Sequence, residues 1–312
     1  MNTLVDNNSA PVRYRVVHET RYTYPSLVTL SQQFLHMTPR DFAYQQTEFH
    51  QIVMDPGEDD GVDGVDYFGN GTRHVTITVP HKTLLVHAES VVALSPRRDL
   101  SQIRGTMAWE HLRDMMLQVR SPATLEICRY LYASPHISCG DLLAQYARVS
   151  FTPGRPLLDA AMDLTRRIFD DFEFDDKATE ISTTLEELLE WRRGVCQDFA
   201  HLMIGCLRSL GLPARYISGY ILTHPPAGQA RLIGADASHA WVSLFCPGLG
   251  WIDFDPTNHC LVQREHITLG WGRDFSDVTP MRGLVLGGNG QELQVNVTVI
   301  PLNEEFAEAL PA

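Results

Sequence analysis

Short runs of β-branched and aromatic residues dominate the first third of the chain. Such runs cover residues 13–18 and 20–24, and residues 74–79 alternate polar with apolar side chains. Residues 84–94 add a further apolar run. These patterns favour strands, and no helical stripe interrupts them. They predict a β-rich domain over residues 11–98, folded as a small sandwich or an open sheet.

Farther along the chain, apolar residues at helical spacing replace the strand-like runs. The spacing is weak over residues 109–119 and 123–133, which we interpret as a partly helical connector spanning 99–154. It is strong over residues 157–172 and predicts an amphipathic helix there. A run of Ser and Thr followed by two glutamates is a capping-box pattern, which predicts a helix over residues 185–192.

A helix, a strand and a hairpin complete the pattern. The helix is predicted over residues 196–210, because Gly211 ends the apolar stripe. The strand covers residues 214–222, and the hairpin strands cover 239–245 and 251–255. Helices followed by sheet within one module indicate an α+β core. The predicted units are a β-rich domain over 11–98, a connector over 99–154, a core over 155–290, and a C-terminal strand and tail over 291–312.

Composition and charge narrow the classes of function. The 312 residues are 44% hydrophobic, which is ample for a buried core, and the formal net charge is −13. An acidic balance argues against nucleic acid as a partner, because neutralising phosphates requires a basic surface. No apolar run approaches the roughly 18 residues that a membrane-spanning helix needs, so we expect no membrane partner.

Cysteine usage and the start of the sequence bear on location. Six cysteines are spread along the chain without a CxxC pair, which suits free thiols in a reducing compartment. The N-terminal residues lack the basic stretch and apolar run that mark a secretory signal. We therefore expect a cytoplasmic protein, and the sequence leaves its oligomeric state open.

One of these cysteines occupies a chemically favourable position. Cys196 opens the helix predicted over 196–210, where free backbone N–H groups and the helix dipole stabilise an anion. The same N–H groups could receive the oxyanion of a tetrahedral intermediate. Most cysteines are small packing residues, however, so position alone leaves both interpretations open.

The predicted hairpin offers this cysteine a partner. A turn of five residues pairs Trp241 with Asp255 and Ser243 with Asp253. His239 then shares one face of the hairpin with Asp255, its diagonal neighbour. Asp253 lies about 6–7 Å farther along the strand. A histidine held by an aspartate is the general base that a cysteine nucleophile needs, so the register favours Asp255 over Asp253.

The order of these motifs resembles that of the transglutaminase-like superfamily. Its successive core motifs resemble residues 194–200, 211–216, 238–241 and 250–257, and residues 39–40, 66–70 and 80–81 resemble the β-rich region that precedes this core in bacterial members. The resemblance implies a papain/transglutaminase-like core, a central helix packed on an antiparallel sheet, after a β-sandwich-like N-terminal domain. It also implies Cys196 as nucleophile, His239 as base and Asp255 as the carboxylate that orients the histidine.

Four more side chains are candidates for the substrate cleft. Gln197 and Asp198 follow the cysteine in the first turn of its helix. Trp241 and Trp251 lie on the hairpin that carries the histidine and the aspartate. The charge of Asp198 also suits a first helical turn by itself, so its position is explained without a role in the cleft. We expect the two tryptophans to line or floor the cleft.

The sequence predicts neither a metal nor a cofactor. Cys246, His259, Cys260 and His266 do not have the spacing of a zinc site. The acidic run 58–63 lacks the alternating ligands and the distal glutamate of a calcium loop, and it predicts a solvated turn. The proposed chemistry needs only side chains of the chain itself.

The resemblance implies amide-bond chemistry on a protein or peptide substrate. Cys196 would form an acyl-enzyme thioester, which water or an amine then resolves. No calcium-loop signature is present, so we favour hydrolysis of peptide or isopeptide bonds by a cysteine peptidase or amidase. A protein-glutamine transglutaminase, acting by amine transfer or deamidation, is the alternative. A non-catalytic binding or scaffold module is a second alternative. Loss of the Cys, His or Asp would be the expected sign of such a module, and the sequence keeps all three residues.

Overall fold

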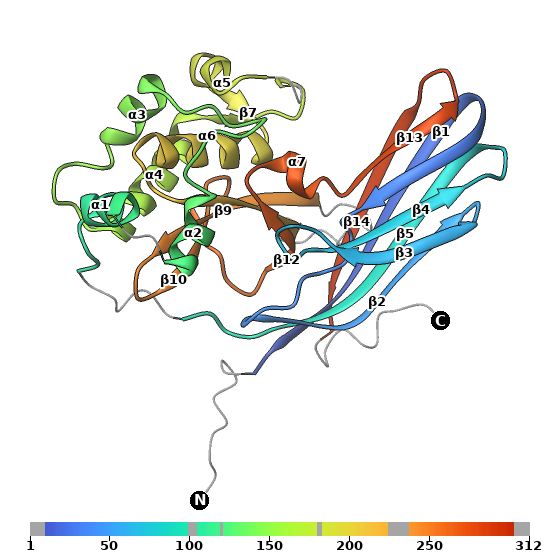
Figure 1. The fold of residues 1–312 in the computed structure, drawn as a ribbon, viewed down its shortest axis with the longest axis horizontal. Helices are drawn as coiled ribbons and strands as arrows, with labels where there is room; N and C mark the ends of the chain where they lie inside the picture. Colours follow the sequence, from blue (N-terminus) through green and yellow to red (C-terminus); the bar gives the residue numbers. More distant parts are fainter. Residues whose placement is uncertain (1–9, 99–104, 119–120, 180–182, 224–236, 303–312) are drawn as a thin grey trace, which may run out of the picture.

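The computed structural model describes residues 10–98, 105–118, 121–179, 183–223 and 237–302. They form two lobes, an elongated β-sandwich and a helical lobe built on a second sheet (Figure 1). The sandwich combines strands from both ends of the chain, coloured blue to cyan and red in Figure 1. Within the described ranges, no helix is both long enough and apolar enough to cross a bilayer.

A single long strand, β1 (Val12–Leu35), organises the sandwich. Its pairing is interrupted between Thr23 and Val28, so its two halves have different neighbours. The first half lies between β5 (His81–Leu94) and β14 (Glu292–Pro301). Alternate residues of β5 and of this half of β1 are buried, which is the period of two expected of strands with one covered face.

The second half of β1 lies between β4 (Gly71–Ile77) and β13 (Met281–Gly287). The outer strands are β2 (Gln45–Asp55), which pairs with β5, and β3 (Asp60–Val65), which pairs with β4. Side chains from both halves meet in one core, which includes Val28, Ile77, Leu84 and Val86. The predicted β-sandwich-like N-terminal domain is confirmed.

The sandwich differs from the sequence prediction in several strands. β1 is one strand where two short ones were expected, and β2 was not anticipated. The acidic run 58–63 was expected to be a solvated turn, but β3 begins inside it. Arg73 of β4 pairs with both Glu58 and Asp63, which offsets the charge of the run. β13 lies within the predicted core segment 155–290, yet it pairs with β1 in the sandwich.

All the described helices except the last, short one precede the second sheet in the chain, as the sequence predicts. α4 (Leu157–Asp171) and α5 (Leu185–Trp191) have nearly their predicted bounds, and Thr184 forms the predicted capping box with Glu187. The remaining helices are α1 (Trp109–Gln118), α2 (Pro122–Cys128), α3 (Asp141–Arg148), α6 (Cys196–Ser209) and α7 (Phe275–Val278), and the short strands are β6 (Glu173–Phe174) and β7 (Arg193–Gly194).

The second sheet is antiparallel, in the order β11-β10-β9-β8-β12. Its strands are β8 (Ala214–Ile221), β9 (Ala237–Cys246), β10 (Gly250–Asp255), β11 (Cys260–Leu261) and β12 (His266–Gly272). In the β9–β10 hairpin Ser243 lies opposite Asp253, which is the predicted register. Helix α6 packs on this sheet and shares a buried core with Ala240, Val242 and Leu244. The expected central helix on an antiparallel sheet is confirmed.

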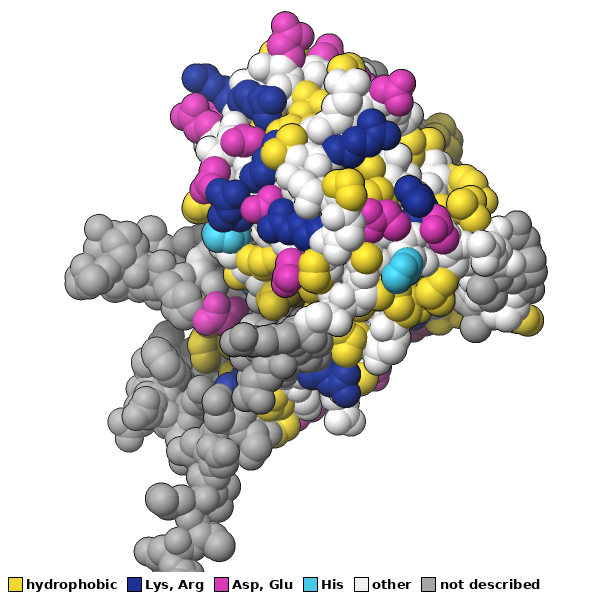
Figure 2. Space-filling view, turned by 90° about the vertical axis from the view of Figure 1, so that its left-hand side faces the viewer, with side chains coloured by type: hydrophobic (Ala, Val, Ile, Leu, Met, Phe, Trp, Pro, Cys, Tyr) yellow, Lys and Arg dark blue, Asp and Glu magenta, His cyan; other side chains and the backbone are white. Residues whose placement is uncertain are grey.

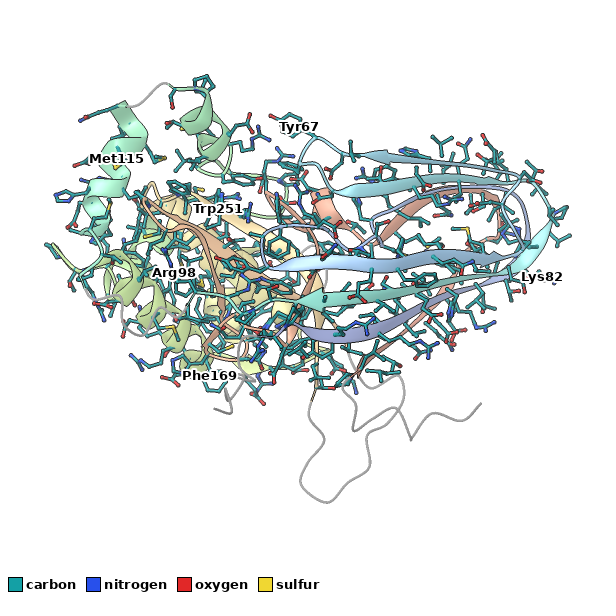
Figure 3. All side chains as sticks on the ribbon, turned by 90° about the horizontal axis from the view of Figure 1, so that it is seen from below. Tyr67, Lys82, Arg98, Met115, Phe169 and Trp251 are labelled. Carbon is teal, nitrogen blue, oxygen red and sulfur yellow. The ribbon has the colours of Figure 1, made fainter. Side chains whose placement is uncertain are left out.

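The two lobes share buried contacts. Tyr14, Val92 and Val299 of the sandwich pack with Tyr220 of β8 and Ile267 of β12. Because this cluster excludes water between the lobes, the sandwich directly supports β12, an edge strand of the second sheet, and its neighbour β8. Figure 3 shows the lobes side by side, with Trp251 in the helical lobe and Lys82 at the far tip of the sandwich.

Polar side chains of the sandwich also hold strand β12. The Gln45 amide bonds both backbone groups of Thr268, at 2.7 and 2.8 Å. Asn70 does the same for Trp271, at 2.8 and 3.0 Å. The Arg40 guanidinium lies 3.6 Å from the centre of the Trp271 ring. The position of β12 therefore depends on the sandwich as well as on its neighbour β8.

Basic and acidic side chains are interspersed on the face of the molecule in Figure 2. Pairs of opposite charge account for part of this surface. On α4, for example, Arg166 pairs with Asp163 at 3.1 Å and with Asp170 at 2.7 Å. Exposed pairs of this kind contribute little to stability, so their main effect is to neutralise the surface locally.

Candidate active site

Cys196 is the first residue of α6, and the chain before it is closely fixed. Val195 is extended (φ −113°, ψ 177°), and its N–H donates to the Asp198 carboxylate at 2.9 Å. The Thr179 hydroxyl donates to the same oxygen at 2.6 Å. A side chain at Gly194 would lie 2.8 Å from that oxygen and displace it. These contacts hold the half-buried thiol at the N-terminus of the helix.

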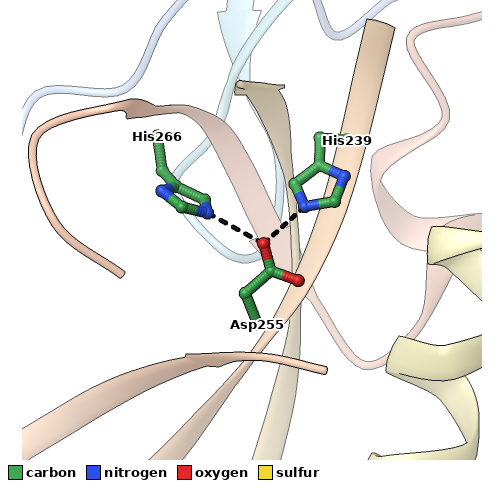
Figure 4. Close-up of side chains that lie close together, drawn as sticks. All are labelled: His239, Asp255 and His266. Atoms are coloured by element: carbon green, nitrogen blue, oxygen red, sulfur yellow. Dashed lines mark hydrogen bonds and ion pairs between the residues drawn. The ribbon is translucent and has the colours of Figure 1, made fainter. Parts of the chain in front are cut away.

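His239 of β9 interacts with both Asp255 and Cys196. Its Nε2 lies 2.7 Å from Asp255 Oδ2 (Figure 4). Burial alone would lower the pKa of His239, but hydrogen bonds to Asp255 and to Cys196 raise it to about 10. Because Asp255 engages Nε2, Nδ1 is the ring nitrogen left for the thiol. The imidazolium form of His239 is therefore favoured throughout the neutral pH range.

The Asp255 carboxylate is fully buried and surrounded by donors. Its Oδ1 accepts the backbone N–H groups of Thr257 and Asn258 at 2.9 and 3.1 Å. Its Oδ2 accepts the Asn258 side-chain amide at 2.7 Å and faces Nε2 of His239 and of His266 at 2.7 and 2.9 Å. Burial raises the pKa of Asp255, but these partners hold it far below its usual range. The carboxylate is therefore an anion across the neutral pH range.

The other aspartate of the hairpin has different partners. Asp253 pairs with Arg97 at 2.7 Å and accepts a hydrogen bond from Trp241 Nε1 at 3.4 Å. The nearby Arg97 and Arg215 guanidinium groups hold the pKa of Asp253 below its usual range, against the effect of burial. The geometry thus agrees with the register argument, which chose Asp255 as the partner of the histidine.

The four predicted cleft residues occupy different environments. Asp198 is buried and serves the helix start, and Gln197 is half-buried beside Cys196. The Trp241 ring is fully buried, with its centroid 6.1 Å from that of His239. The Trp251 ring packs against Tyr130, Phe245 and the Arg215 guanidinium. Their part in substrate binding stays a prediction.

Sequence reasoning missed two residues that contact Asp255. His266 lies on β12, which is separated from β9 by β8, and the sequence presents it only as one of four residues whose spacing does not fit a zinc site. No local pattern indicates its position, since sheet order is decided by long-range pairing. The contact of Asn258 with Asp255 could have been predicted from the sequence, because Asp255 and the residues after it form a turn that side chains of Asp and Asn favour.

Burial disfavours the thiolate form of four of the other cysteines. All six cysteines are free. Burial raises the pKa of the Cys246 thiol to about 11 and that of Cys260 to about 12. Burial also raises the pKa values of Cys139 and Cys206. A thiolate-selective reagent should therefore discriminate against these four side chains.

His239, Asp255 and His266 also present three ligand-type atoms within 4.8 Å of one another. Zinc bonds of about 2.0–2.2 Å in a tetrahedral site would separate neighbouring ligand atoms by about 3.3 Å. The observed nitrogen–oxygen separations, 2.7 and 2.9 Å, are those of hydrogen bonds. The geometry therefore fits two histidines donating to one carboxylate better than a shared metal ion.

Comparison with known proteins defines the family. The family described as "Bacterial transglutaminase-like N-terminal region" matches residues 14–93, and the one described as "Transglutaminase-like superfamily" matches residues 145–256. An uncharacterized protein of Mycobacterium bovis is 38% identical over 306 residues, or 95% of each chain. The chain belongs to the transglutaminase-like superfamily. Members of this superfamily are generally enzymes.

Other transglutaminase-like relatives cover the chain to different extents. An uncharacterized protein of Mycobacterium leprae is 30% identical over 93% of this chain and 99% of its own length. A protein-glutamine gamma-glutamyltransferase of Pseudomonas aeruginosa is 37% identical over 78 residues, or 25% of this chain and 12% of its own. A solved structure from Cytophaga hutchinsonii, named as a candidate cysteine protease, has a TM-score of 0.76 at 19% identity, covering 96% of this chain and 93% of its own. This last likeness shows that the fold extends over both lobes.

Proposed function

We propose that this transglutaminase-like protein is a thiol enzyme that hydrolyses peptide or isopeptide bonds, with Cys196 as nucleophile, His239 as acid and base, and Asp255 as the orienting carboxylate. The observation that carries the proposal is the contact of His239 with Asp255 on one side and with Cys196 on the other. The thiol lies at the start of α6, where backbone N–H groups can stabilise an oxyanion.

The proposed reaction has two stages. The Cys196 thiolate attacks the amide carbonyl carbon, and the His239 imidazolium gives its proton to the departing amine, which leaves a thioester on sulfur. Neutral His239 then takes a proton from water, and the resulting hydroxide attacks the thioester. The acid product leaves, while Cys196 and the protonated His239 are regenerated as an ion pair. Asp255 keeps the imidazole oriented and stabilises its positive charge in both stages.

Hydrolysis and acyl transfer differ only in the second nucleophile. A lysine amine in place of water would make the protein a transglutaminase, and the short match to the Pseudomonas aeruginosa glutamyltransferase favours that alternative. The full-length likeness to a candidate cysteine protease supports hydrolysis. We favour hydrolysis because the likeness to the candidate cysteine protease spans both lobes, whereas the match to the glutamyltransferase spans a quarter of the chain.

A competition experiment tests the proposal. The purified protein is incubated with a library of glutamine-containing peptides, with and without a primary amine, and mass spectrometry scores cleavage, deamidation and amine incorporation together. We expect cleaved peptides, in the same yield with and without the amine. Amine incorporation without cleavage would replace hydrolysis by transfer, and the absence of all three products would contradict the enzyme proposal.

Two variants make this experiment specific. Cys196→Ala removes the proposed nucleophile and should abolish every product. Cys128→Ala changes another half-buried free thiol, outside the proposed site, and should leave the product pattern unchanged. Equal activity in the two variants would show that the products arise from a contaminant or from another group.

A further inference from the structure

His266 approaches the candidate active site from a distant part of the sheet. In the order β10-β9-β8-β12, its strand is separated from that of Asp255 by two others. Nevertheless its Nε2 lies 2.9 Å from Asp255 Oδ2, on the oxygen that also faces His239 (Figure 4). Two imidazoles from different strands therefore converge on one carboxylate oxygen.

The sheet is shaped to allow this convergence. Gly219 of β8 lies opposite His239 of β9 in the register. A Cβ atom at Gly219 would lie 2.6 Å from the Trp241 ring and 2.0 Å from the Ile267 carbonyl oxygen, so no other residue fits there without a shift. The Trp241 ring extends over this glycine and meets the His266 ring edge to face, with centroids 5.3 Å apart. Trp241 thereby restrains His266.

The environment of His266 also defines its protonation. Burial lowers its pKa, and the charged groups that face it are Asp255, which raises the pKa, and His239 and Arg97, which lower it. Its Nδ1 is buried, and the described residues offer this nitrogen no hydrogen-bond partner. A neutral ring with its proton on Nε2 satisfies these conditions, because Asp255 is an anion and needs a donor. His266 is then a fixed donor rather than a second base.

We propose that His266 is a positioning residue of the thiol site, which holds Asp255 Oδ2 in line with His239 Nε2. The inference rests on the proposed function, because it assigns His266 a role through His239 and not through substrate. His266 also shares the negative charge of Asp255, which limits how strongly the carboxylate holds the proton of His239. Asn258 holds the same oxygen from the other side, so loss of His266 weakens the arrangement without abolishing it.

The expected effects of His266→Phe follow from the lost donor. With the carboxylate less well oriented, kcat should fall roughly ten- to hundredfold, the range for one hydrogen bond to a charged group, while KM stays nearly unchanged. One donor fewer on Oδ2 leaves more negative charge for the His239 imidazolium, so the pKa of His239 should rise. NMR titration of labelled histidines measures this shift directly, with His239 assigned by its absence in His239→Gln.

Two comparisons separate positioning from a structural role. His266→Gln keeps an N–H donor and should recover much of the lost kcat. His18→Phe removes another buried histidine, whose Nδ1 lies 2.8 Å from Tyr220 Oη, and should lower stability without moving the pKa of His239. If His266→Phe does not fold, as judged by thermal unfolding, the shorter His266→Asn should show the same loss of kcat and the same upward shift.

The outcomes of these experiments distinguish the role of His266 from the proposed function on which it rests. Folded His266→Phe or His266→Asn with wild-type kcat and an unmoved His239 titration would overturn the inference alone. A wild-type protein without amide turnover, whose Cys196 alkylates no faster than Cys128, would overturn the proposed function instead. Loss of wild-type turnover on adding a chelator, regained with zinc, would show that His266 serves a metal and would also overturn the inference.

Discussion

Asp253 and Asp255 lie two residues apart on β10 and face different partners. Arg97 pairs with Asp253, whereas Asp255 faces His239 and His266. Asp255→Asn removes the negative charge that stabilises the His239 imidazolium, so we expect kcat to fall on the order of a hundredfold or more. Asp253→Asn leaves the His239–Asp255 contact in place and should keep most of its turnover. The measurement is amide turnover per folded molecule, and equal losses would contradict the assignment of Asp255.

The protonation of His239 sets the alkaline limit of the proposed reaction. Its pKa is raised to about 10, so the imidazolium is present below that pH and is lost as the pH rises through it. Because the departing amine needs this proton, kcat/KM should decline above about pH 10. In Cys196→Ala the contribution of the thiol is gone, and the pKa of His239 should be lower. An NMR titration that gives an unchanged or higher value would contradict the Cys196–His239 contact.

Helices α5 and α6 both begin with a side-chain contact to a backbone N–H group, and of the two only that of α6 lies beside the thiol. Asp198 caps α6, and Thr184 with Glu187 caps α5. Asp198→Ala and Thr184→Ala should each lower the free energy of unfolding by about 1 kcal/mol, measured by urea denaturation. Asp198→Ala alone should also slow alkylation of Cys196, because it frees the chain before the helix. Equal alkylation in both variants would show that the cap does not position the thiol.

Among the helices and strands, the sequence predicted those that are determined by residues close together in the chain. The apolar spacing of α4 and α6 and the capping box of α5 depend on residues that are close together in the sequence, and the β9–β10 register follows from one turn. It did not predict β12 beside β8, or β13 and β14 beside β1, since these pairings join distant segments. Cys196, His239 and Asp255 were therefore within reach of sequence reasoning, whereas His266 was not.

At the scale of the whole molecule, the two lobes depend on each other. Gln45 of β2 accepts the buried N–H of Thr268 on β12, so Gln45→Ala leaves that group without its partner. We expect a loss of about 1–3 kcal/mol, seen as a lower midpoint in thermal unfolding. Gln51→Ala, an exposed position on the same strand, is the control and should change little. A single transition monitored by both near- and far-ultraviolet circular dichroism would agree with the shared core, and two separate transitions would contradict it.

The proposed function requires that the whole fold prepares one thiol out of six. Its most direct test is the rate at which iodoacetamide labels each cysteine near neutral pH, followed by mass spectrometry of peptides. Cys196 should react on the order of a hundredfold faster than the buried thiols, and His239→Gln should remove most of this advantage. Slow labelling of all six cysteines at similar rates, in the wild-type protein, would contradict the proposed function.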